Sequence, residues 1–570
     1  MLANDGIEVR GTKGGAKGGR SIYATRRFKP GDVIARFDNP AVVLPPGHRA
    51  LEYCNHCLKK QRPAGVKLRA CTGCKTVAYC GPACQRANWS LVHKLECKAI
   101  QRLHEAKPAH QPDWVPTPIR AAAQVMLRPQ VLARFEELEG HVEQWRKKDG
   151  TDLQLQSHGV VKCLGLDTVT FERLETSFQV LCKVGCFLLV LVAGLNYLQI
   201  LMTLLQTNAF SRTEEYYETG GVFLDTTLAM INHSCVPNAL VQFGGRTATL
   251  RATSFLDPGD EIEISYIDQT QPRGKRHGEL DLYHFECSCY KCQKDLDEYQ
   301  VAMADPTIEL NALSVMTDIE RFKNPPGGGN LDPQQGMEVL KLHRIFHALY
   351  RDMKSNEKHE WLRKAYKTAS WFPKVGKYAI EPFAQVVEEA TSYYGKDCNN
   401  HECALAVASL SAYEIEPYKH IAPFHPQRLK SLSAIAIALS NTAPNPAKLV
   451  KLARDMAATK KLTKSGLKVL ENLDQVSLCQ MVLTIIDMYS PQAPSADWEV
   501  VVLANEMLGD IGSLPGRERE NALINAWRKD PKGMEEFFRY GLVEPIRTLS
   551  ELGKVVLEVD LAQDRDLFAK

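Results

Sequence analysis

The sequence lacks a surplus of either charge, because its 70 lysines and arginines face 67 aspartates and glutamates, a formal net charge of +3. No global field therefore draws the chain onto nucleic acid or a membrane. The start of the chain (MLANDGIEVR) has no apolar core behind a basic segment, so we expect no secretory signal. No basic localisation cluster stands out either, and we expect residence in the nucleus, the cytoplasm or both.

The composition also lacks the bias of a disordered chain. Hydrophobic residues make up 44% and charged residues 24% of the 570 positions, which are ordinary globular values. At about 150 residues per domain, this length predicts three or four domains. The 17 cysteines, in a chain without a secretory signal, indicate a reducing compartment, where metal binding is favoured over a disulfide framework.

One short stretch holds eight potential zinc ligands, namely Cys54, Cys57, Cys71, Cys74, Cys80, Cys84, His93 and Cys97. The pattern is a CxxC pair, a gap, a second CxxC pair, and then two pairs spaced four residues apart. Such spacings aim two side chains at one ion, and tetrahedral zinc takes four thiolate or imidazole ligands. The stretch therefore predicts two closed sites, which are structural because they leave no position open for a substrate.

A second cysteine group, ECSCYKC, supplies Cys287, Cys289 and Cys292. Three thiolates this close together still lack a fourth ligand for zinc. Cys235, inside the sequence INHSCVPN, is the candidate for that ligand. We therefore expect three structural zinc ions in all.

The segment from Cys54 to Cys97 resembles a MYND zinc finger at all eight ligand positions. In that family the ligands interleave, so the resemblance implies one zinc on Cys54, Cys57, Cys80 and Cys84, and the other on Cys71, Cys74, His93 and Cys97. It also implies either binding of proline-rich peptides or support of a neighbouring domain, and the sequence does not choose between these two.

Residues 221–267 alternate like β-structure broken by turns. The segments 238–243, 247–252 and 261–267 carry β-branched and aromatic residues at period two, which predicts strands. Gly244-Gly245 indicates a hairpin. Short strands with tight turns predict a small β-domain rather than a parallel doubly wound sheet.

This region resembles the SET domain of protein lysine methyltransferases. INHSCVPN matches the family's NHSCxPN signature, and GDEIEISYID matches its GEExxxxY segment. The first SET strands correspond to 17–24 and 28–34, so that the finger separates two SET pieces, as in the SET-and-MYND (SMYD-type) subfamily. One departure is Ser21, which stands where the family usually has the second glycine of a G-x-G pattern.

The resemblance implies methyl transfer from S-adenosylmethionine to a lysine of a histone or non-histone protein. In such enzymes a tyrosine hydroxyl closes an aromatic channel near the methyl group, and Tyr266 matches that position. Tyr283, Phe285 and Phe210 match the channel walls. The positions that match the cofactor site are Gly19, Arg20, Asn208, Ile231, Asn232, His233, Tyr266 and Phe285. Within this set, Asn208 is expected on the methionine end and Arg20 on its carboxylate.

A hydrophobic run spans residues 184–205 and reaches the length of a transmembrane helix. A single crossing would separate the two SET pieces, which must share one domain, so we expect no membrane span. Two interpretations remain open. The run is a buried helix of the SET insert, or it is an extra segment from a gene model that retained an intron.

After residue 295 the sequence shows no ligand cluster and no strand pattern. Residues 324–336 (NPPGGGNLDPQQG) predict a linker. Amphipathic helices are predicted at 337–353, 360–371, 380–394 and 426–440. The helical spacing fits either a plain bundle or a TPR-like stack, and the SMYD resemblance favours the second.

These observations predict an α+β protein, a SET β-fold split by a MYND finger, with a post-SET zinc site and an all-α TPR-like C-terminal domain. The expected boundaries are 1–50 for the N-terminal SET piece, 51–100 for the finger, 101–220 for the SET helical insert, 221–270 for the SET core, 271–296 for the post-SET segment, 297–336 for a helical segment and linker, and 337–570 for the helical domain. We expect a monomer that acts on a protein substrate.

Two functions remain in view. The first is a protein-lysine N-methyltransferase centred on Tyr266. The second is an inactive adaptor that binds peptides through the finger and the helical domain, an option raised by Ser21 and by the hydrophobic run. The finger segment has few basic residues and no pattern for a major-groove helix, so sequence-specific DNA binding is not expected.

Overall fold

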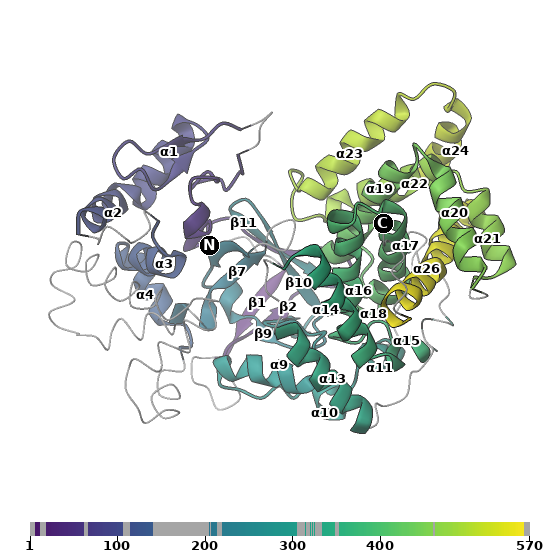
Figure 1. Cartoon of the computed structure of the whole chain (residues 1–570). Coiled ribbons are helices and arrows are strands. Elements are labelled where there is room, and N and C mark those ends of the chain that lie inside the picture. Colours follow the sequence, from purple (N-terminus) through teal and green to yellow (C-terminus); the bar gives the residue numbers. More distant parts are fainter. Residues whose placement is uncertain are drawn as a thin grey trace. The chain divides into compact units, whose positions relative to one another are not determined.

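The computed structural model of the chain is shown in Figure 1. It describes residues 6–11, 19–61, 66–106, 114–140, 204–205, 207–213, 219–304, 314, 320, 322, 324, 333–347, 353–459 and 462–563. These residues form two compact units. The first takes the chain up to Tyr266 and returns for Gly278–Glu286, and the second takes Ile267–His277 and the chain from Cys287 onward.

All the strands of the described chain are short. They are β1 (Ile7–Arg10), β2 (Ser21–Ala24), β3 (Val33–Phe37), β4 (Val42–Leu44), β5 (Arg69–Ala70), β6 (Ala78–Tyr79), β7 (Phe210–Thr213), β8 (Thr219–Leu224), β9 (Asn232–His233), β10 (Ala239–Gly244), β11 (Thr247–Ala252) and β12 (Glu263–Ile264). They make small sheets in the orders β1-β2, β10-β11-β3, β12-β9, β4-β8-β7 and β5-β6. This arrangement confirms the small β-domain that the sequence predicts.

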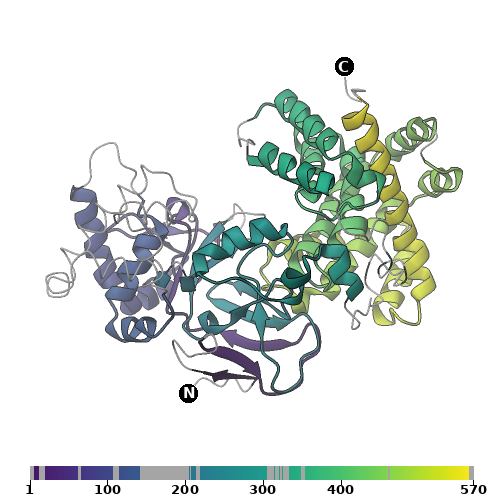
Figure 2. The same cartoon turned by 90° about the horizontal axis from the view of Figure 1, so that it is seen from below.

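Long-range pairing joins the strands before the finger and the strands after it into one domain. Strand β11 forms a hairpin with β10 and pairs on its other edge with β3, which lies more than 200 residues earlier. Strand β4 likewise pairs with β8. Figure 2 shows the purple N-terminal strands beside the teal strands. The predicted strand at residues 247–252 coincides with β11, whereas only 263–264 of the predicted 261–267 are strand. Glu261 forms an isolated bridge with Tyr23 instead.

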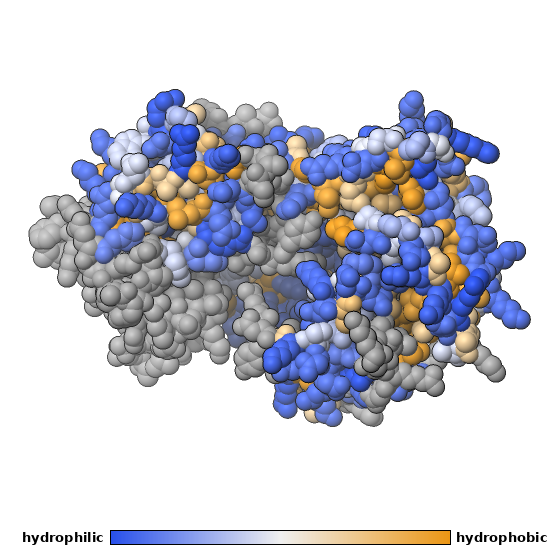
Figure 3. Space-filling view, turned by 45° about the horizontal axis from the view of Figure 1, so that its top comes forward, coloured by the Kyte–Doolittle hydropathy of each residue, from blue (hydrophilic) through white to orange (hydrophobic). Residues whose placement is uncertain are grey.

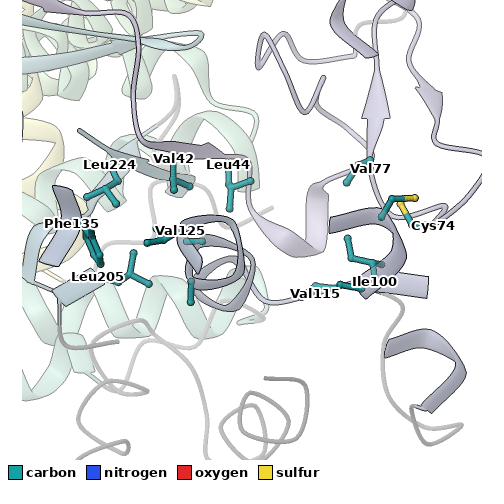
Figure 4. Packing of buried hydrophobic residues seen from close by; sticks show 14 of the residues in the cluster. Val42, Leu44, Cys74, Val77, Ile100, Val115, Val125, Phe135, Leu205 and Leu224 are labelled. Atoms are coloured by element: carbon teal, nitrogen blue, oxygen red, sulfur yellow. The ribbon is translucent and has the colours of Figure 1, made fainter. Parts of the chain in front are cut away.

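The zinc finger packs on the neighbouring segments of the first unit through one hydrophobic cluster. Cys74 and Val77 from the finger lie in the same cluster as Val125 of helix α3 (Thr117–Met126) and Leu44 of β4. Figure 4 shows this cluster from close by. Because a segment this short cannot bury a core of its own, the shared cluster supports its fold, and zinc bound at the predicted ligands would add to that support.

The remaining helices of the first unit and its borders are short. They are η1 (Gly47–Arg49), α1 (Pro82–Asn88), η2 (Trp89–His93), α2 (Lys94–Ala106), α4 (Pro129–Glu136), η3 (Leu228–Met230), α9 (Arg273–Leu280) and η4 (Asp281–Tyr283). Helix α9 runs from one unit into the other in sequence.

The described residues of the second unit form helices only, which confirms the all-α C-terminal region. They are α10 (Tyr290–Lys294), α11 (Glu298–Ala304), α13 (Pro333–His347), α14 (Ser355–Thr368), α15 (Trp371–Lys374), α16 (Phe383–Ser392), η5 (Tyr393–Asp397), α17 (His401–Leu410), η6 (Ser411–Ile415), α18 (Glu416–Lys419), α19 (Pro426–Thr442), α20 (Pro446–Ala457), α21 (Lys464–Glu471), α22 (Gln475–Met488), η7 (Ser490–Gln492), α23 (Glu499–Gly512), α24 (Glu518–Lys529), α25 (Glu535–Phe538), η8 (Arg539–Val543), α26 (Glu544–Leu557) and η9 (Glu558–Ala562). The TPR-like repeat within this unit stays a prediction.

The core of the helical unit lies between α17 and α26, which make its most extensive helix–helix contact. Gly553 of α26 allows this approach, since a Cβ atom there would meet the Ala406 carbonyl oxygen of α17 at 2.4 Å. Any larger residue at this position would push the two helices apart.

Some predicted boundaries in the C-terminal half shift. Helix α13 begins at Pro333, inside the predicted linker 324–336, because proline is well placed in the first turn of a helix. The helix predicted at 426–440 is α19, which begins at Pro426 and continues to Thr442.

The hydrophobic run at 184–205 lies outside the described residues except for its last two positions, so its two interpretations stay open. Within the described residues, no single helix has the length and hydropathy to cross a bilayer. Helices α21 and α22 pass that test only as a pair, with an 89° bend between them.

Candidate active site and zinc clusters

Three distant segments of the first unit meet at the candidate site. Strand β9 lies parallel to β12, with Asn232 opposite Glu263. The Ile262 backbone nitrogen donates a hydrogen bond to the Ile22 carbonyl (2.8 Å), which places β2 beside the start of the same segment. Strand β2, the NHSC segment and the tyrosine-bearing segment are therefore held together by backbone hydrogen bonds.

Aromatic rings gather around Tyr266. Its ring centroid lies 4.9 Å from that of Tyr283, 5.2 Å from His233 and 6.4 Å from Phe285. The ring planes are tilted or edge-to-face, which is the favoured geometry for aromatic pairs. Phe285 is 37% exposed, so the cluster reaches the protein surface.

Phe210, which the sequence predicts as a further channel wall, has a different aromatic partner. Its ring packs against Phe243 of β10 at 6.2 Å. Both it and Tyr266 border the same buried hydrophobic cluster. The structure therefore places Phe210 next to the site's supporting core, and its role as a wall stays a prediction.

The Tyr266 hydroxyl donates a hydrogen bond to the Ile231 carbonyl oxygen. Burial raises the pKa of Tyr266 above its ordinary value, and the nearby Tyr283 and Glu261 add to that rise. The hydroxyl therefore keeps its proton at neutral pH. It can orient a cationic or polar group through its oxygen, but it is a poor base.

His233 links Tyr266 to a cysteine. Its Nδ1 accepts the Tyr266 backbone N–H (3.0 Å), while its Nε2 lies 3.3 Å from the Cys235 sulfur. A backbone nitrogen can only donate, so Nδ1 is the unprotonated nitrogen and Nε2–H points at the thiol. The sequence predicts His233 as a cofactor residue, and the structure adds that its ring fixes the backbone of Tyr266.

Asn232 and Asn208, both predicted to contact the cofactor, are held by hydrogen bonds within the protein. The Asn232 amide nitrogen donates to Ser21 Oγ (2.7 Å) and Glu261 Oε1 (2.8 Å). The Asn208 amide nitrogen donates to the carbonyls of Glu139 (2.7 Å) and Leu204 (2.9 Å). Each amide thus uses both hydrogens within the protein, and each keeps a carbonyl oxygen that can accept from a ligand.

Gly19 and Arg20 directly precede Ser21, which accepts from Asn232, and they lie near the 137–139 segment that accepts from Asn208. Gly19 has φ of +89°, a conformation that favours glycine, and Arg20 donates to the Glu137 carbonyl. A Cβ atom at position 19 would approach the Glu139 carboxylate to 3.9 Å. The predicted pairing of Arg20 with a cofactor carboxylate stays a prediction, since one of its nitrogens already serves the protein backbone.

The first zinc cluster consists of Cys54, Cys57, Cys80 and Cys84, whose sulfurs all lie within 4.8 Å of one another. The Cys57 and Cys80 sulfurs are 3.7 Å apart, and those of Cys80 and Cys84 are 3.4 Å apart. Zinc–sulfur bonds of about 2.3 Å in a tetrahedron require sulfur separations of roughly 3.8 Å. Hydrogen bonding from Cys57 lowers the pKa of Cys54, and the same contact together with burial raises the pKa of Cys57.

The second zinc cluster consists of Cys71, Cys74, His93 and Cys97, all buried. The Cys71 and Cys97 sulfurs are 3.8 Å apart, and His93 Nε2 lies 3.7 Å from the Cys74 sulfur. Both clusters therefore have the interleaved membership that the MYND resemblance implies.

A third cluster joins the thiols of Cys235, Cys287, Cys289 and Cys292 within 4.8 Å. Arg276 Nη2 donates to the Cys292 sulfur at 3.5 Å. With three closed four-ligand clusters, the donor sets fit the three structural zinc ions expected from the sequence.

The buried carboxylate of Glu96 supports the second cluster, and no sequence pattern pointed to it. Its Oε2 lies 2.9 Å from His93 Nδ1, and its two oxygens accept from Arg120 at 3.0 and 3.2 Å. Gln124 of the same helix α3 also donates to it. The contact leaves His93 Nε2 free to face the metal, which is the usual arrangement around a zinc-binding histidine.

Sequence reasoning also missed Glu261 as a partner of Asn232, and it treated Ser21 only as a departure. Only the strand pairings reveal these contacts. A cavity of about 210 Å³ borders β1 and β3, but its lining (Ile7, Val9, Arg36, Phe37, Asp38, Asn39, Asp225 and Thr227) includes none of the predicted site residues.

The sequence of this chain is similar to several known proteins. The MYND finger family matches residues 54–97. The N-lysine methyltransferase SMYD2-B of Danio rerio is 26% identical over 320 residues, which cover 54% of this chain and 65% of that protein. The human histone-lysine N-methyltransferase SMYD3 is 26% identical over 316 residues, covering 54% and 67%. The Arabidopsis thaliana histone-lysine N-methyltransferase ASHR1 is 26% identical over 284 residues, covering 48% and 53%.

A solved structure, the SET domain of LSMT bound to lysine and AdoHcy, aligns over 94% of both chains at 11% identity, with a TM-score of only 0.26. A likeness of that size supports no conclusion about this chain. The finger match and the zinc-ligand clusters show that the chain carries a MYND finger. Its similarity to the SMYD-type lysine methyltransferases, indicated by the sequence, is confirmed. The matched segments span roughly 53–67% of the relatives named above.

Proposed function

We propose that this chain is a protein-lysine N-methyltransferase that uses S-adenosylmethionine. The single observation that supports it most is the aromatic cluster around Tyr266, whose hydroxyl is fixed on the Ile231 carbonyl directly before Asn232 and His233. The named activities of the relatives point to the same chemistry.

The residues present fit the amino-acid end of the cofactor. An ammonium group needs acceptors, and Asn232 and Asn208 each keep a carbonyl oxygen after donating both amide hydrogens to the protein. Gly19 adds a backbone position without a side chain beside them. Under this proposal, these residues and Arg20 hold the methionine portion, and Ile231 and His233 contribute to the nucleoside side.

S-adenosylmethionine, when bound, supplies a methyl group whose bond to sulfur breaks as the bond to the lysine nitrogen forms. The protein must present that nitrogen without its proton, although a lysine in water has a pKa of about 10.4. The rings of Tyr266, Tyr283 and Phe285 remove water from the ammonium and so lower its pKa. The rings also restrict the path of the side chain, which favours its entry along one axis.

The role of Tyr266 in this proposal is to orient. Its hydroxyl hydrogen is committed to the Ile231 carbonyl, and its raised pKa keeps it neutral. The hydroxyl oxygen therefore offers lone pairs to the partially positive groups that meet at the site. Such an interaction is stronger in the transition state than in the ground state, because charge is being redistributed there.

A second candidate function, a peptide adaptor, is favoured by one observation on the finger. Trp89, Leu91 and Leu95 are 42%, 41% and 50% exposed, although they are large and apolar. The face in Figure 3 shows hydrophobic surface interspersed with hydrophilic side chains. Exposed aromatic and aliphatic side chains of this kind suit a proline-rich peptide, and such binding is compatible with either function.

Calorimetric titration of the purified, zinc-loaded chain with S-adenosylhomocysteine tests the proposal. We expect saturable binding with one site per chain, followed by methyl transfer to a lysine in a protein substrate screen. If no binding occurs while the chain still binds a proline-rich peptide, and Trp89→Ala abolishes that peptide binding, the enzyme proposal is wrong and the adaptor is supported.

A further inference from the structure

The side chain of Asn232 is held by two partners from different strands. Ser21 opens β2, and Glu261 precedes β12. Tyr23 forms an antiparallel bridge with Glu261, and the Ala24 nitrogen donates to the Asp260 carbonyl at 2.9 Å. The backbone positions of both partners are therefore fixed relative to each other before their side chains meet Asn232.

The chemistry of Glu261 decides which way the Asn232 amide points. An ionised carboxylate has no hydrogen to donate, so the group facing Glu261 Oε1 at 2.8 Å must be the NH2 group of Asn232. The second amide hydrogen then goes to Ser21 Oγ at 2.7 Å. Within the described residues, no protein donor is left for Asn232 Oδ1, which the amide thus presents away from both partners.

Ser21 fits its position without strain. It is absent from the residues with positive φ, and it pairs with Arg10 across the β1–β2 ladder. A glycine at this place would leave one amide hydrogen of Asn232 without its partner. Ser21 therefore supplies the second hydrogen-bond acceptor for the Asn232 amide and does not disable the site.

We propose that Ser21 is a positioning residue for the cofactor ammonium, acting through Asn232. This inference rests on the proposed function. With both hydrogens held, Asn232 offers only its carbonyl oxygen, which accepts from a protonated amine and not from a carboxylate. Without the Ser21 hydroxyl, the amide is held by Glu261 alone and can rotate about that single hydrogen bond, so that the oxygen spends less time in the accepting orientation.

The test compares two ligands by calorimetry. S-adenosylhomocysteine carries the amino-acid ammonium, whereas 5′-methylthioadenosine keeps the nucleoside and the sulfur but lacks the amino acid. We expect Ser21→Ala to weaken S-adenosylhomocysteine binding about five- to tenfold, the loss typical of one hydrogen bond. The same variant should bind 5′-methylthioadenosine within about twofold of the wild type. Ser21→Thr, which keeps the hydroxyl, should restore most of the lost affinity.

Ser254→Ala is the matched control, since Ser254 is a half-buried serine of the same unit whose side chain is outside this network. Equal losses for both ligands, no loss for either, or failure of Ser21→Thr to recover affinity would each overturn the inference. Absence of S-adenosylhomocysteine binding by the wild-type chain would overturn the proposed function, and this inference with it.

Discussion

The Tyr266 hydroxyl is the group on which the proposed chemistry depends most. It is committed as a donor to the Ile231 carbonyl, and the Tyr266 backbone nitrogen is committed to His233. The tyrosine is thus fixed at both its backbone and its tip. A group held this way contributes by its position, because it needs little reorganisation when the reacting groups meet.

Replacing Tyr266 with phenylalanine removes the hydroxyl and keeps the ring. We expect kcat to fall on the order of 100-fold, because the lost interaction acts mainly in the transition state. The dissociation constant for S-adenosylhomocysteine should stay within about twofold. Steady-state kinetics and calorimetry on the same preparation measure both quantities.

Tyr540→Phe is a control for this change, because Tyr540 is 83% exposed. It should leave both quantities as in the wild type. A parallel loss of cofactor affinity in Tyr266→Phe would assign the hydroxyl to ground-state binding and contradict the orienting role.

At the scale of elements, helix α3 is tied to the finger by a buried charge network. Arg120 donates to Glu96 through two nitrogens and to the Asn55 side chain through a third (3.0 Å). Burial alone would raise the pKa of Glu96, but Arg120 and His93 lower it well below its ordinary value. The carboxylate therefore stays ionised, and it connects the zinc-ligand residue His93 to helix α3.

Glu96→Gln removes the charge while keeping the shape. We expect zinc in the second cluster to be released about tenfold faster to a chelator, as is typical when a partner of a zinc-bound histidine is changed. The other two clusters should release zinc as in the wild type. A chromogenic chelator that counts zinc per chain over time resolves the two phases.

Glu52→Gln supplies the comparison, since Glu52 pairs with Arg49 at the surface of the same finger region (2.8 Å). Its release curve should match the wild type, as exposed ion pairs contribute little. Faster release of all three zinc ions in Glu96→Gln would show a general loss of folding instead of a local effect on His93.

For the molecule as a whole, the helical unit holds several half-buried titratable groups. The rings of His420 and His425 stack at 4.0 Å, and burial lowers the pKa of His425 to about 3, with Arg428 adding to the shift. His425 Nδ1 also accepts the Gln427 backbone N–H at the start of α19 (3.3 Å). In the opposite direction, burial raises the pKa of Glu416 to about 7.

The two pKa shifts change the free energy of unfolding with pH in opposite directions. An unfolded histidine titrates near pH 6.5, so between that value and pH 3 the unfolded chain holds a proton that folded His425 does not. Its contribution to stability is complete above about pH 6.5 and falls with acidification by about 1.4 kcal/mol per pH unit. Folded Glu416 keeps a proton that the unfolded chain loses, so its contribution is lost as the pH rises through about 7.

His425→Asn keeps a helix-capping side chain but cannot titrate. We expect the stability lost between pH 7 and pH 5 to shrink by about 2 kcal/mol, with a correspondingly smaller fall in the melting temperature. Calorimetric melting at the two pH values measures it. His48→Asn, at an exposed histidine, should leave the fall unchanged. An equal fall in His425→Asn and the wild type would show that His425 does not carry the acid sensitivity.

The sequence by itself determined the features that depend on local spacing. Pairs such as Cys54 with Cys57 can reach one ion because only a few backbone bonds separate them, and so the ligands could be identified from their intervals. The hairpin of β10 and β11 was predictable for the same reason, since its alternation and its turn residues are contiguous.

Only the tertiary structure decided contacts between distant residues. Ser21 and Asn232 lie 211 positions apart, and Glu96 and Arg120 belong to different helices. Serine, glutamate and arginine are ordinary surface residues in a sequence, and nothing in their spacing distinguishes a buried partner from a solvated one. Which of these residues become partners is decided by strand and helix packing. That packing depends on burial summed over the whole core and not on any local pattern.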